Sequence, residues 1–265
     1  MYEFEHHKPA TVADAVSAMK GADDGKLLAG GQTMIPTLKQ RLASPSDLVD
    51  LGGIAELKGI TVSGGTITIG AMTTHAAVAD SADIKATLPA LAELADHIGD
   101  AQVRNRGTIG GSVANNDPAA DYPAACLALG ATIHTSQRDI SADDFFTGMF
   151  ETALEEDEII TKVSFPVAKK AAYMKFPNPA SRYALVGVFI ADGPAGTRVA
   201  VTGAGQDGVF RVPEMESALS ANFSADAVSG VKVSADDLNA DIHASADYRA
   251  HLITVMAKRA VAKAG

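Results

Sequence analysis

Two glycine-rich segments constrain this chain more than any other feature of its sequence. The first is Ala-Gly-Gly-Gln-Thr at residues 29–33, and the second is Thr-Ile-Gly-Gly-Ser at residues 108–112. Paired glycines allow backbone conformations that are closed to residues with a Cβ atom, and they let peptide N–H groups come close to an oxyanion. Neither segment contains an acidic residue, so together they predict a cradle for a ligand with two adjacent phosphates.

The first segment is expected to join a strand to a helix. Residues 26–29 are typical of a buried strand, and apolar residues recur at helical spacing at 34, 35, 38 and 42. Pro36 stands near the start of this helix, where its missing N–H group costs little. The N-terminus of a helix favours an anion, so this arrangement supports the predicted phosphate site.

A longer helix is expected before the second segment. Apolar residues at 88, 91, 94, 95 and 98 predict one helix from Leu88 to about Val103. Arg104 and Arg106 follow it, and two interpretations stay open for them. They stand near a phosphate, or they are basic residues favourably placed after a helix C-terminus.

The remaining elements mix helices with strands, which indicates an α+β fold. In chain order they are an extended segment near 2–4, a helix over 11–19, a strand over 47–51, a hairpin over 59–70, a helix over 123–129, strands over 131–135, 158–166, 171–176, 184–191 and 198–202, and an amphipathic helix over 246–262. A boundary near 167–171 would separate a first domain from a smaller sheet packed against helices.

Charge and cysteine content exclude several classes of function. A net charge of -10 over 265 residues argues against a nucleic-acid partner or an anionic membrane surface. The single cysteine, Cys126, lies in an apolar stretch, so this chain alone builds neither a disulfide nor a four-cysteine iron–sulfur cluster. No leader pattern and no apolar run of membrane-spanning length is present, so we expect a cytoplasmic protein.

Other familiar motifs do not apply to this chain. Residues 203–208 satisfy G-x-G-x-x-G, but extended chain follows rather than a helix, so we interpret them as a turn. There is no Walker, HExxH or GxSxG motif, and the seven histidines are scattered, so we expect surface or capping histidines and no metal site.

Three segments taken together resemble the medium, FAD-binding subunit of the molybdenum hydroxylases, and within them the aerobic carbon monoxide dehydrogenase type. They are residues 28–36, residues 108–112 with Asp-Pro-Ala-Ala-Asp at 117–121, and Ala-Ser-Arg-Tyr-Ala at 180–184. Residues 204–205 and 241–249 resemble the C-terminal domain of the family, so the resemblance extends over nearly the whole chain.

The resemblance implies a fold and a set of partners. A two-part FAD-binding domain of the vanillyl-alcohol oxidase (PCMH) type would cover residues 1–167, with parts at about 1–56 and 57–167, and a CO dehydrogenase flavoprotein C-terminal domain would cover 168–265. FAD would be bound noncovalently. The chain would sit between a small subunit with two [2Fe–2S] clusters and a large subunit with a molybdenum–pterin cofactor, in a dimer of heterotrimers. It would pass electrons through FAD to an external acceptor such as a quinone, a role compatible with a peripheral position at the inner face of the membrane.

The resemblance also implies site residues. Backbone N–H groups at 30–34 and 109–112 would hold the diphosphate, and Asp121 would accept hydrogen bonds from ribose or adenine. Lys175 and the turn before Ala184 would stand at the flavin ring, with Tyr183 as the candidate catalytic residue that covers one face. The full set is Ala29, Gly30, Gly31, Gln32, Thr33, Met34, Thr108, Ile109, Gly110, Gly111, Ser112, Asp121, Ile160, Lys175 and Tyr183. Asp121 could instead be a solvated loop acid, and Lys175 part of an ordinary strand.

Two other classes of function stay open. One is a self-sufficient FAD-dependent oxidase or reductase of the same fold, which would need its own substrate base and pocket. The other is a non-enzymatic nucleotide-binding scaffold, which would be colourless and would not take up FAD. In this family the molybdenum subunit chooses the substrate, so this chain does not identify it.

Overall fold

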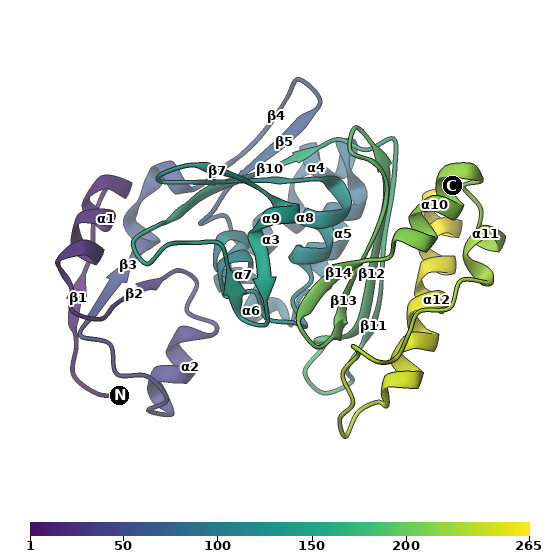
Figure 1. Cartoon of the computed structure of the whole chain (residues 1–265). Coiled ribbons are helices and arrows are strands. Elements are labelled where there is room, and N and C mark those ends of the chain that lie inside the picture. Colours follow the sequence, from purple (N-terminus) through teal and green to yellow (C-terminus); the bar gives the residue numbers. More distant parts are fainter.

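Residues 1–57 form a small parallel sheet with two helices (Figure 1), and the computed structural model describes residues 1–265. The strand order is β1 (Glu5–His7), β3 (Asp47–Asp50), β2 (Gly25–Leu28). Parallel neighbours need crossover connections, and these contain α1 (Val12–Gly21) and α2 (Met34–Lys39). Two short 3-10 turns, η1 (Leu51–Gly53) and η2 (Ala55–Leu57), end this part. The extended segment expected near 2–4 is displaced, because pairing with β3 begins at Glu5.

An antiparallel sheet of five strands forms the middle of the molecule. Its order is β4 (Ile60–Ser63), β5 (Thr66–Gly70), β10 (Ile160–Pro166), β6 (Thr132–Thr135), β7 (Asp139–Ser141). The predicted hairpin is confirmed. Its turn residues Gly64 and Gly65 have φ angles of +57° and +74°, which suit the tight turns that twisted strands prefer. A separate two-stranded ribbon consists of β8 (Phe146–Gly148) and β9 (Glu151–Thr152).

Short helices build the main core together with this sheet. They are α3 (His75–Asp80), α4 (Ala82–Thr87), α5 (Pro89–Asp96), α6 (Ala101–Arg106), α7 (Ile109–Asn115), α8 (Tyr122–Leu129) and α9 (Ala142–Phe145). The single helix predicted from Leu88 to Val103 is wrong. Gly99 has a φ of +50°, and Asp100 caps α6 by accepting a hydrogen bond from the N–H of Val103, so α5 and α6 are separate helices.

The last part of the chain is a four-stranded antiparallel meander with helices on its outer face. Its elements are β11 (Lys170–Pro177), β12 (Ala184–Gly193), β13 (Gly196–Gly205), β14 (Gly208–Arg211), α10 (Pro213–Ala221), α11 (Ala225–Ser229) and α12 (Ala246–Ala264). Figure 1 shows α10 and α12 on one side of this sheet and α8 on the other. All residues of α8 and residues 184–191 of β12 are buried, so both elements are enclosed on all sides.

The motif at 203–208 is a turn, as predicted from the sequence. Strand β13 ends at Gly205 and β14 begins at Gly208, whereas a dinucleotide-binding loop opens a helix. None of the helices combines the length and the apolar character needed to cross a membrane.

Candidate functional site

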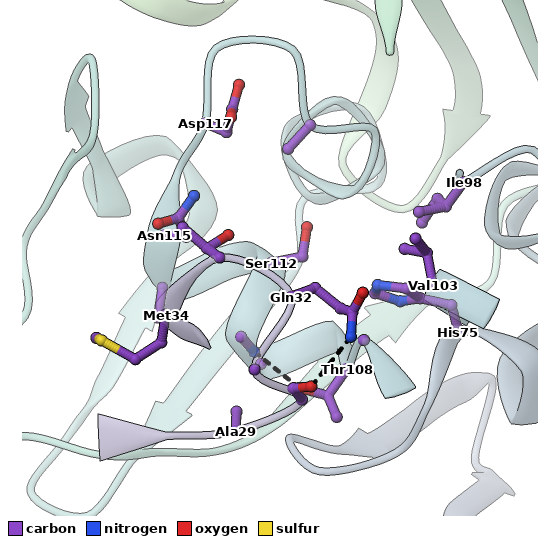
Figure 2. Close-up of a pocket in the computed structure, with 18 of the residues that line it drawn as sticks. Ala29, Gln32, Met34, His75, Ile98, Val103, Thr108, Ser112, Asn115 and Asp117 are labelled. Carbon is purple, nitrogen blue, oxygen red and sulfur yellow. Dashed lines mark hydrogen bonds between the residues drawn. The ribbon is translucent and has the colours of Figure 1, made fainter. Parts of the chain in front are cut away.

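A cavity of about 500 Å³ lies where the first sheet, helices α6 and α7 and the turn before β12 come together. Figure 2 shows residues of both glycine-rich segments around it. The expected site residues line it except for Ile109 and Lys175, and those that do are Ala29, Gly30, Gly31, Gln32, Thr33, Met34, Thr108, Gly110, Gly111, Ser112, Asp121, Ile160 and Tyr183. The fold therefore brings together segments that lie far apart in the sequence.

The first glycine-rich segment leaves its backbone N–H groups open. Gly30 lies so close to the Arg106 backbone that a Cβ atom here would clash with the Arg106 carbonyl oxygen. Gly31 has a φ of +75°, a conformation that favours glycine. None of the N–H groups of residues 30–34 donates a hydrogen bond within the chain, and Thr33 makes no side-chain cap to α2. Such a run of open donors on a cavity wall suits a diphosphate.

The second glycine-rich segment is the first turn of helix α7 rather than an open loop. Thr108 caps the helix, and its hydroxyl accepts a hydrogen bond from the N–H of Gly111. The N–H of Gly110 donates to the Ala71 carbonyl at 2.8 Å, and a Cβ atom on Gly110 would stand 2.5 Å from the Ala71 Cβ. The glycine is therefore needed for close packing of α7 on Ala71, the residue that follows β5.

The expected use of the N–H groups at 109–112 as phosphate donors is wrong for this arrangement. The N–H of Ile109 donates to the Thr73 carbonyl, and that of Ser112 to the Thr108 carbonyl, so all four groups already have acceptors. What this segment offers to the cavity is side chains, above all the hydroxyl of Ser112. The two segments are neighbours, since a Cβ atom on Gly111 would stand 3.3 Å from that of Ala29.

Asp121 is buried in an ion pair at the edge of the cavity. Its carboxylate accepts hydrogen bonds from the Tyr173 hydroxyl and from Lys175 Nζ, and Lys175 also donates to the His97 carbonyl at 3.0 Å. Burial raises the pKa of Asp121, and the charge of Lys175 and the hydrogen bond from Tyr173 act against that rise. The alternative of a solvated loop acid is wrong, because Asp121 is 4% exposed. Asp121 and Lys175 touch, so they would serve the same end of a bound ligand rather than opposite ends.

Tyr183 lines the cavity and is 53% exposed, in a turn held by hydrogen bonds. The Asn178 side chain accepts hydrogen bonds from the N–H groups of Ala180 and Ser181, and the N–H of Asn178 donates to the Tyr183 carbonyl at 2.8 Å. Arg182 adopts a φ of +62°, which is unusual for a residue with a side chain. Partial burial and the nearby carboxylates raise the pKa of Tyr183, so its hydroxyl remains a proton donor at neutral pH.

Arg104 lies at the end of helix α6 rather than at the cavity surface. Its Nη1 donates to the carbonyls of Ile98 and Gly99, and Arg106 also lies in the last turn of α6. For Arg104 the structure shows the helix-terminus interpretation. Arg106 lies against Gly30 of the first segment through its backbone, and for its side chain both interpretations stay open.

His75 lines the cavity and was missed by the sequence interpretation, which treated it as a surface or capping residue. It is 4% exposed, and its Nδ1 atom has no hydrogen-bond partner. Burial, with a smaller contribution from Arg104, lowers the pKa of His75 to about 4, so it is neutral at pH 7. A Cβ atom on Gly107 would stand 2.6 Å from His75 Nε2. The His75 ring lies 5.4 Å from that of Tyr122, centroid to centroid, and close to Gly107, and both neighbours are distant in the sequence, so no local signal marks these contacts.

Glu158 also lines the cavity and was not predicted from the sequence. Its carboxylate accepts hydrogen bonds from Arg138 Nε at 3.0 Å, from Arg138 Nη2 at 3.1 Å and from the Thr135 hydroxyl at 2.6 Å. Burial alone would raise the pKa of Glu158, but these hydrogen bonds lower it to about 2. The ionised side chain thus fixes the chain just before Ile160, which lines the cavity.

A hydrogen-bonded chain of serine, histidine and aspartate lies outside the cavity on the middle sheet. His134 Nδ1 is 2.6 Å from Asp139 Oδ1, and His134 Nε2 is 2.9 Å from Ser164 Oγ. This order of contacts occurs in serine hydrolases. Ser164, however, lies in the central strand and pairs with Thr68 and Thr132 on its two sides, so the sheet occupies the backbone donors that an oxyanion would need.

Known proteins match this chain over almost its full length. The family described as "FAD binding domain in molybdopterin dehydrogenase" matches residues 2–168. The nicotine 6-hydroxylase medium subunit of Paenarthrobacter nicotinovorans is 34% identical, with 97% of this chain and 95% of that protein covered. The carbon monoxide dehydrogenase medium chain of Hydrogenophaga pseudoflava is 35% identical, with 97% and 96% covered.

Solved structures agree with this result. Quinoline 2-oxidoreductase from Pseudomonas putida 86 superposes with a TM-score of 0.88 at 29% identity, with 99% of this chain and 96% of that chain covered. The α+β fold with an FAD-binding domain of the vanillyl-alcohol oxidase type is therefore confirmed. The chain belongs to the FAD-binding medium subunits of the molybdenum hydroxylases, a family of oxidoreductases.

Proposed function

We propose that this chain binds one FAD noncovalently in the 500 Å³ cavity and passes electrons from partner iron–sulfur clusters to an external acceptor. The observation that carries the proposal is the run of open N–H groups at 30–34 on the cavity wall. The volume lies in the range of ligand pockets. Bound FAD would supply the redox chemistry, and the protein would supply binding and orientation.

Each part of the ligand has a proposed location in the cavity. The diphosphate is assigned to the first glycine-rich segment, with the side chains of Gln32, Thr33 and Ser112 as additional donors. We assign the flavin ring to the part of the cavity lined by Ile160 and Tyr183, where the Tyr183 side chain would pack against it. The Asp121–Lys175 ion pair, with 2.9 Å between Oδ1 and Nζ, would act there as one unit that adds no net charge.

The proposed partners follow from the family rather than from this chain's own residues. Cys126 is the only cysteine and is buried, so clusters and molybdenum would be carried by a small and a large subunit, assembled as a dimer of heterotrimers in the cytoplasm. The matched proteins are named as medium subunits or medium chains, which supports such an assembly. We also propose a domain boundary at residues 167–168.

Blocking the cavity tests the proposed function. Ser112→Trp would place an indole in the cavity, so the folded protein should purify without flavin and should not take up added FAD. Ser229→Trp is the matched control, because Ser229 is exposed on α11 far from the cavity lining. The measurements are flavin absorbance per polypeptide and the thermal midpoint. Full flavin content in folded Ser112→Trp would contradict the proposed site, and a wild-type chain that cannot be reconstituted with FAD would favour a scaffold role.

A further inference from the structure

A histidine and two carboxylates come together on the first sheet, at the end of the molecule opposite α12 (Figure 1). Glu5 and His7 are two positions apart on β1, so their side chains share one face of the strand. Asp47, the first residue of β3, pairs in register with Glu5. These three residues are called the β1–β3 cluster. None of them lines the proposed FAD cavity.

The three side chains are close enough to share one metal ion. One ligand atom from each lies within 4.8 Å of the other two. Zinc binds histidine nitrogen and carboxylate oxygen at about 2.0–2.2 Å in a tetrahedral arrangement, which places two ligand atoms about 3.4 Å apart. His7 Nε2 is 2.6 Å from Asp47 Oδ1 and 4.0 Å from Glu5 Oε2. These distances lie on either side of the tetrahedral value, so small side-chain rotations would place all three atoms around one ion.

Asp47 is held in position from behind. Its side chain is 15% exposed, and its second oxygen, Oδ2, accepts a hydrogen bond from the Ser46 hydroxyl at 2.6 Å. That hydroxyl accepts in turn from the N–H of Asp24 at 2.8 Å. The hydrogen bond from Ser46, followed by the one with His7, lowers the pKa of Asp47, so the carboxylate is ionised at neutral pH. Hydrogen bonds of this kind orient metal ligands.

The charges of the β1–β3 cluster favour a cation. His7 is the only ion-pair partner of Glu5 and of Asp47, and Lys26 is paired with Asp24 at 2.7 Å instead. Two neighbouring carboxylates repel each other, and a divalent cation between them would remove that repulsion. The imidazole favours zinc over calcium or magnesium, because the latter two prefer oxygen ligands alone.

The neighbouring histidine has a different environment. His6 lies on the opposite face of β1, and its Nε2 atom is 3.8 Å from one carboxylate, that of Asp50. Asp50 already accepts a hydrogen bond from the N–H of Gly52. Two adjacent histidines thus differ in the number of carboxylates beside them. The sequence gave no sign of this difference, because His7 and Asp47 are 40 positions apart.

We propose that the β1–β3 cluster binds one Zn²⁺ ion, with His7, Asp47 and Glu5 as ligands and a water molecule as the fourth. The Glu5 side chain is 82% exposed, so water reaches the site. Strand β1 has three residues and pairs with β3 alone, so the ion would tie an edge strand to the sheet that carries the first glycine-rich segment. This inference goes beyond the proposed function and does not depend on it.

Substitution of one histidine at a time tests the site. His7→Gln removes the imidazole ligand, and His6→Gln is the matched control on the other face of the same strand. Glu5→Gln is a second test at an exposed position, where the fold should be retained. The probe is zinc chloride, titrated by calorimetry into the full chain after treatment with a chelator and without an added histidine tag. Thermal midpoints with and without Zn²⁺ and the FAD content are measured on the same samples.

The expected results separate the zinc site from nonspecific binding. His7→Gln and Glu5→Gln should each weaken Zn²⁺ binding by at least about tenfold, which corresponds to about 1.4 kcal/mol, whereas His6→Gln should bind as the wild type does. Zn²⁺ should raise the thermal midpoint of the wild type and of His6→Gln, and excess Ca²⁺ should not displace it.

Several outcomes would overturn the zinc site. They are a wild-type chain that binds no Zn²⁺ or whose midpoint Zn²⁺ does not raise, equal affinity in the wild type and His7→Gln, an equal loss in His6→Gln, and displacement of Zn²⁺ by Ca²⁺. FAD content should be the same in all three variants, because the β1–β3 cluster lies outside the cavity lining. Failure of the zinc site would therefore leave the proposed function intact.

Discussion

The two glycine-rich segments look alike in the sequence but have different roles in the structure. Residues 30–34 keep their N–H groups free, whereas the N–H groups of residues 109–112 all donate within the chain. Gly110 is required because α7 packs directly on Ala71. A pair of glycines therefore indicates that another group comes close to the backbone. The hydrogen-bond partners of the backbone show whether that group is a ligand or a neighbouring part of the chain.

This difference predicts that the two regions affect different properties of the chain, stability in one case and FAD affinity in the other. Substitutions in or beneath the second region should lower the free energy of unfolding of the FAD-free chain. Substitutions in the first region should change FAD affinity more than stability. Substitutions in each region, taken from the largest expected effect to the smallest, test whether stability and FAD affinity depend on different regions.

The largest loss of stability is expected for Asp121→Ala, just beyond the second region. The change leaves Lys175 buried without its carboxylate, and removal of one partner of a buried pair costs about 3–5 kcal/mol. Urea unfolding of the FAD-free chain measures it. The double variant Asp121→Leu with Lys175→Met is the control and should recover most of the loss. A single variant as stable as the wild type would show that the pair does not support this region.

A pH-dependent loss of stability is expected from His75, which packs closely against Gly107 next to the second region. The pKa of His75 is about 4 in the folded chain against 6.5 for a free histidine, so the unfolded chain binds the proton first. Its contribution to stability is complete above pH 6.5 and is lost as pH falls towards 4, by up to about 3 kcal/mol.

Unfolding experiments between pH 7 and 4 can isolate this contribution. His75→Asn should flatten the pH dependence, whereas His251→Asn, at an exposed position on α12, should leave it unchanged. An unaltered slope in His75→Asn would assign the pH dependence to other groups.

Gly110→Ala should lower stability by about 1–3 kcal/mol, the usual range for overpacking a core. The added Cβ would stand 2.5 Å from the Ala71 Cβ, whereas one on Gly111 would meet its nearest atom, the Thr108 hydroxyl, at 3.0 Å. Gly111→Ala is thus the matched control with a smaller effect. Equal thermal midpoints for the two variants would contradict the packing role of Gly110.

A smaller change in stability than that of Asp121→Ala is expected for Gly31→Ala in the first region. Its φ of +75° makes alanine unfavourable by about 1–2 kcal/mol. FAD affinity should fall by more than this loss, because the change displaces the open N–H groups. Titration of the FAD-free variant with FAD measures the affinity. Unchanged affinity in a destabilised chain would remove the distinction between the two regions.

Local signals in the sequence predicted most of the secondary structure. Thr11 accepts a hydrogen bond from the N–H of Asp14 as a helix cap, and the hairpin at Gly64 and Gly65 follows from its alternating strands. The break between α5 and α6 was missed because the apolar spacing continues to Ile98, although Gly99 and Asp100 are a stop and a cap. The apolar spacing favours one continuous helix and the Gly99–Asp100 pair favours an end and a new start; in the structure the second signal prevails.

The candidate site was predictable in its position but not in its contacts. The glycine-rich segments and Tyr183 could be named from the sequence because their motifs are specific. The Asp121–Lys175 pair joins residues 54 positions apart, and the burial of His75 depends on several elements. A single sequence carries no signal for such pairings, so the two residues were assigned to opposite ends of the ligand.

The enclosed helix α8 has a consequence for the way this chain is made. Its covers, β12 and β13, are synthesised later than α8 itself, and the main core includes Tyr173 and Phe189 from beyond residue 168. A nascent chain therefore carries an uncovered apolar helix until the sheet of β11–β14 has left the ribosome. Such a state is prone to aggregation. A fragment that stops at residue 168 would stay in that state permanently, so expression of the whole polypeptide is the route to folded protein.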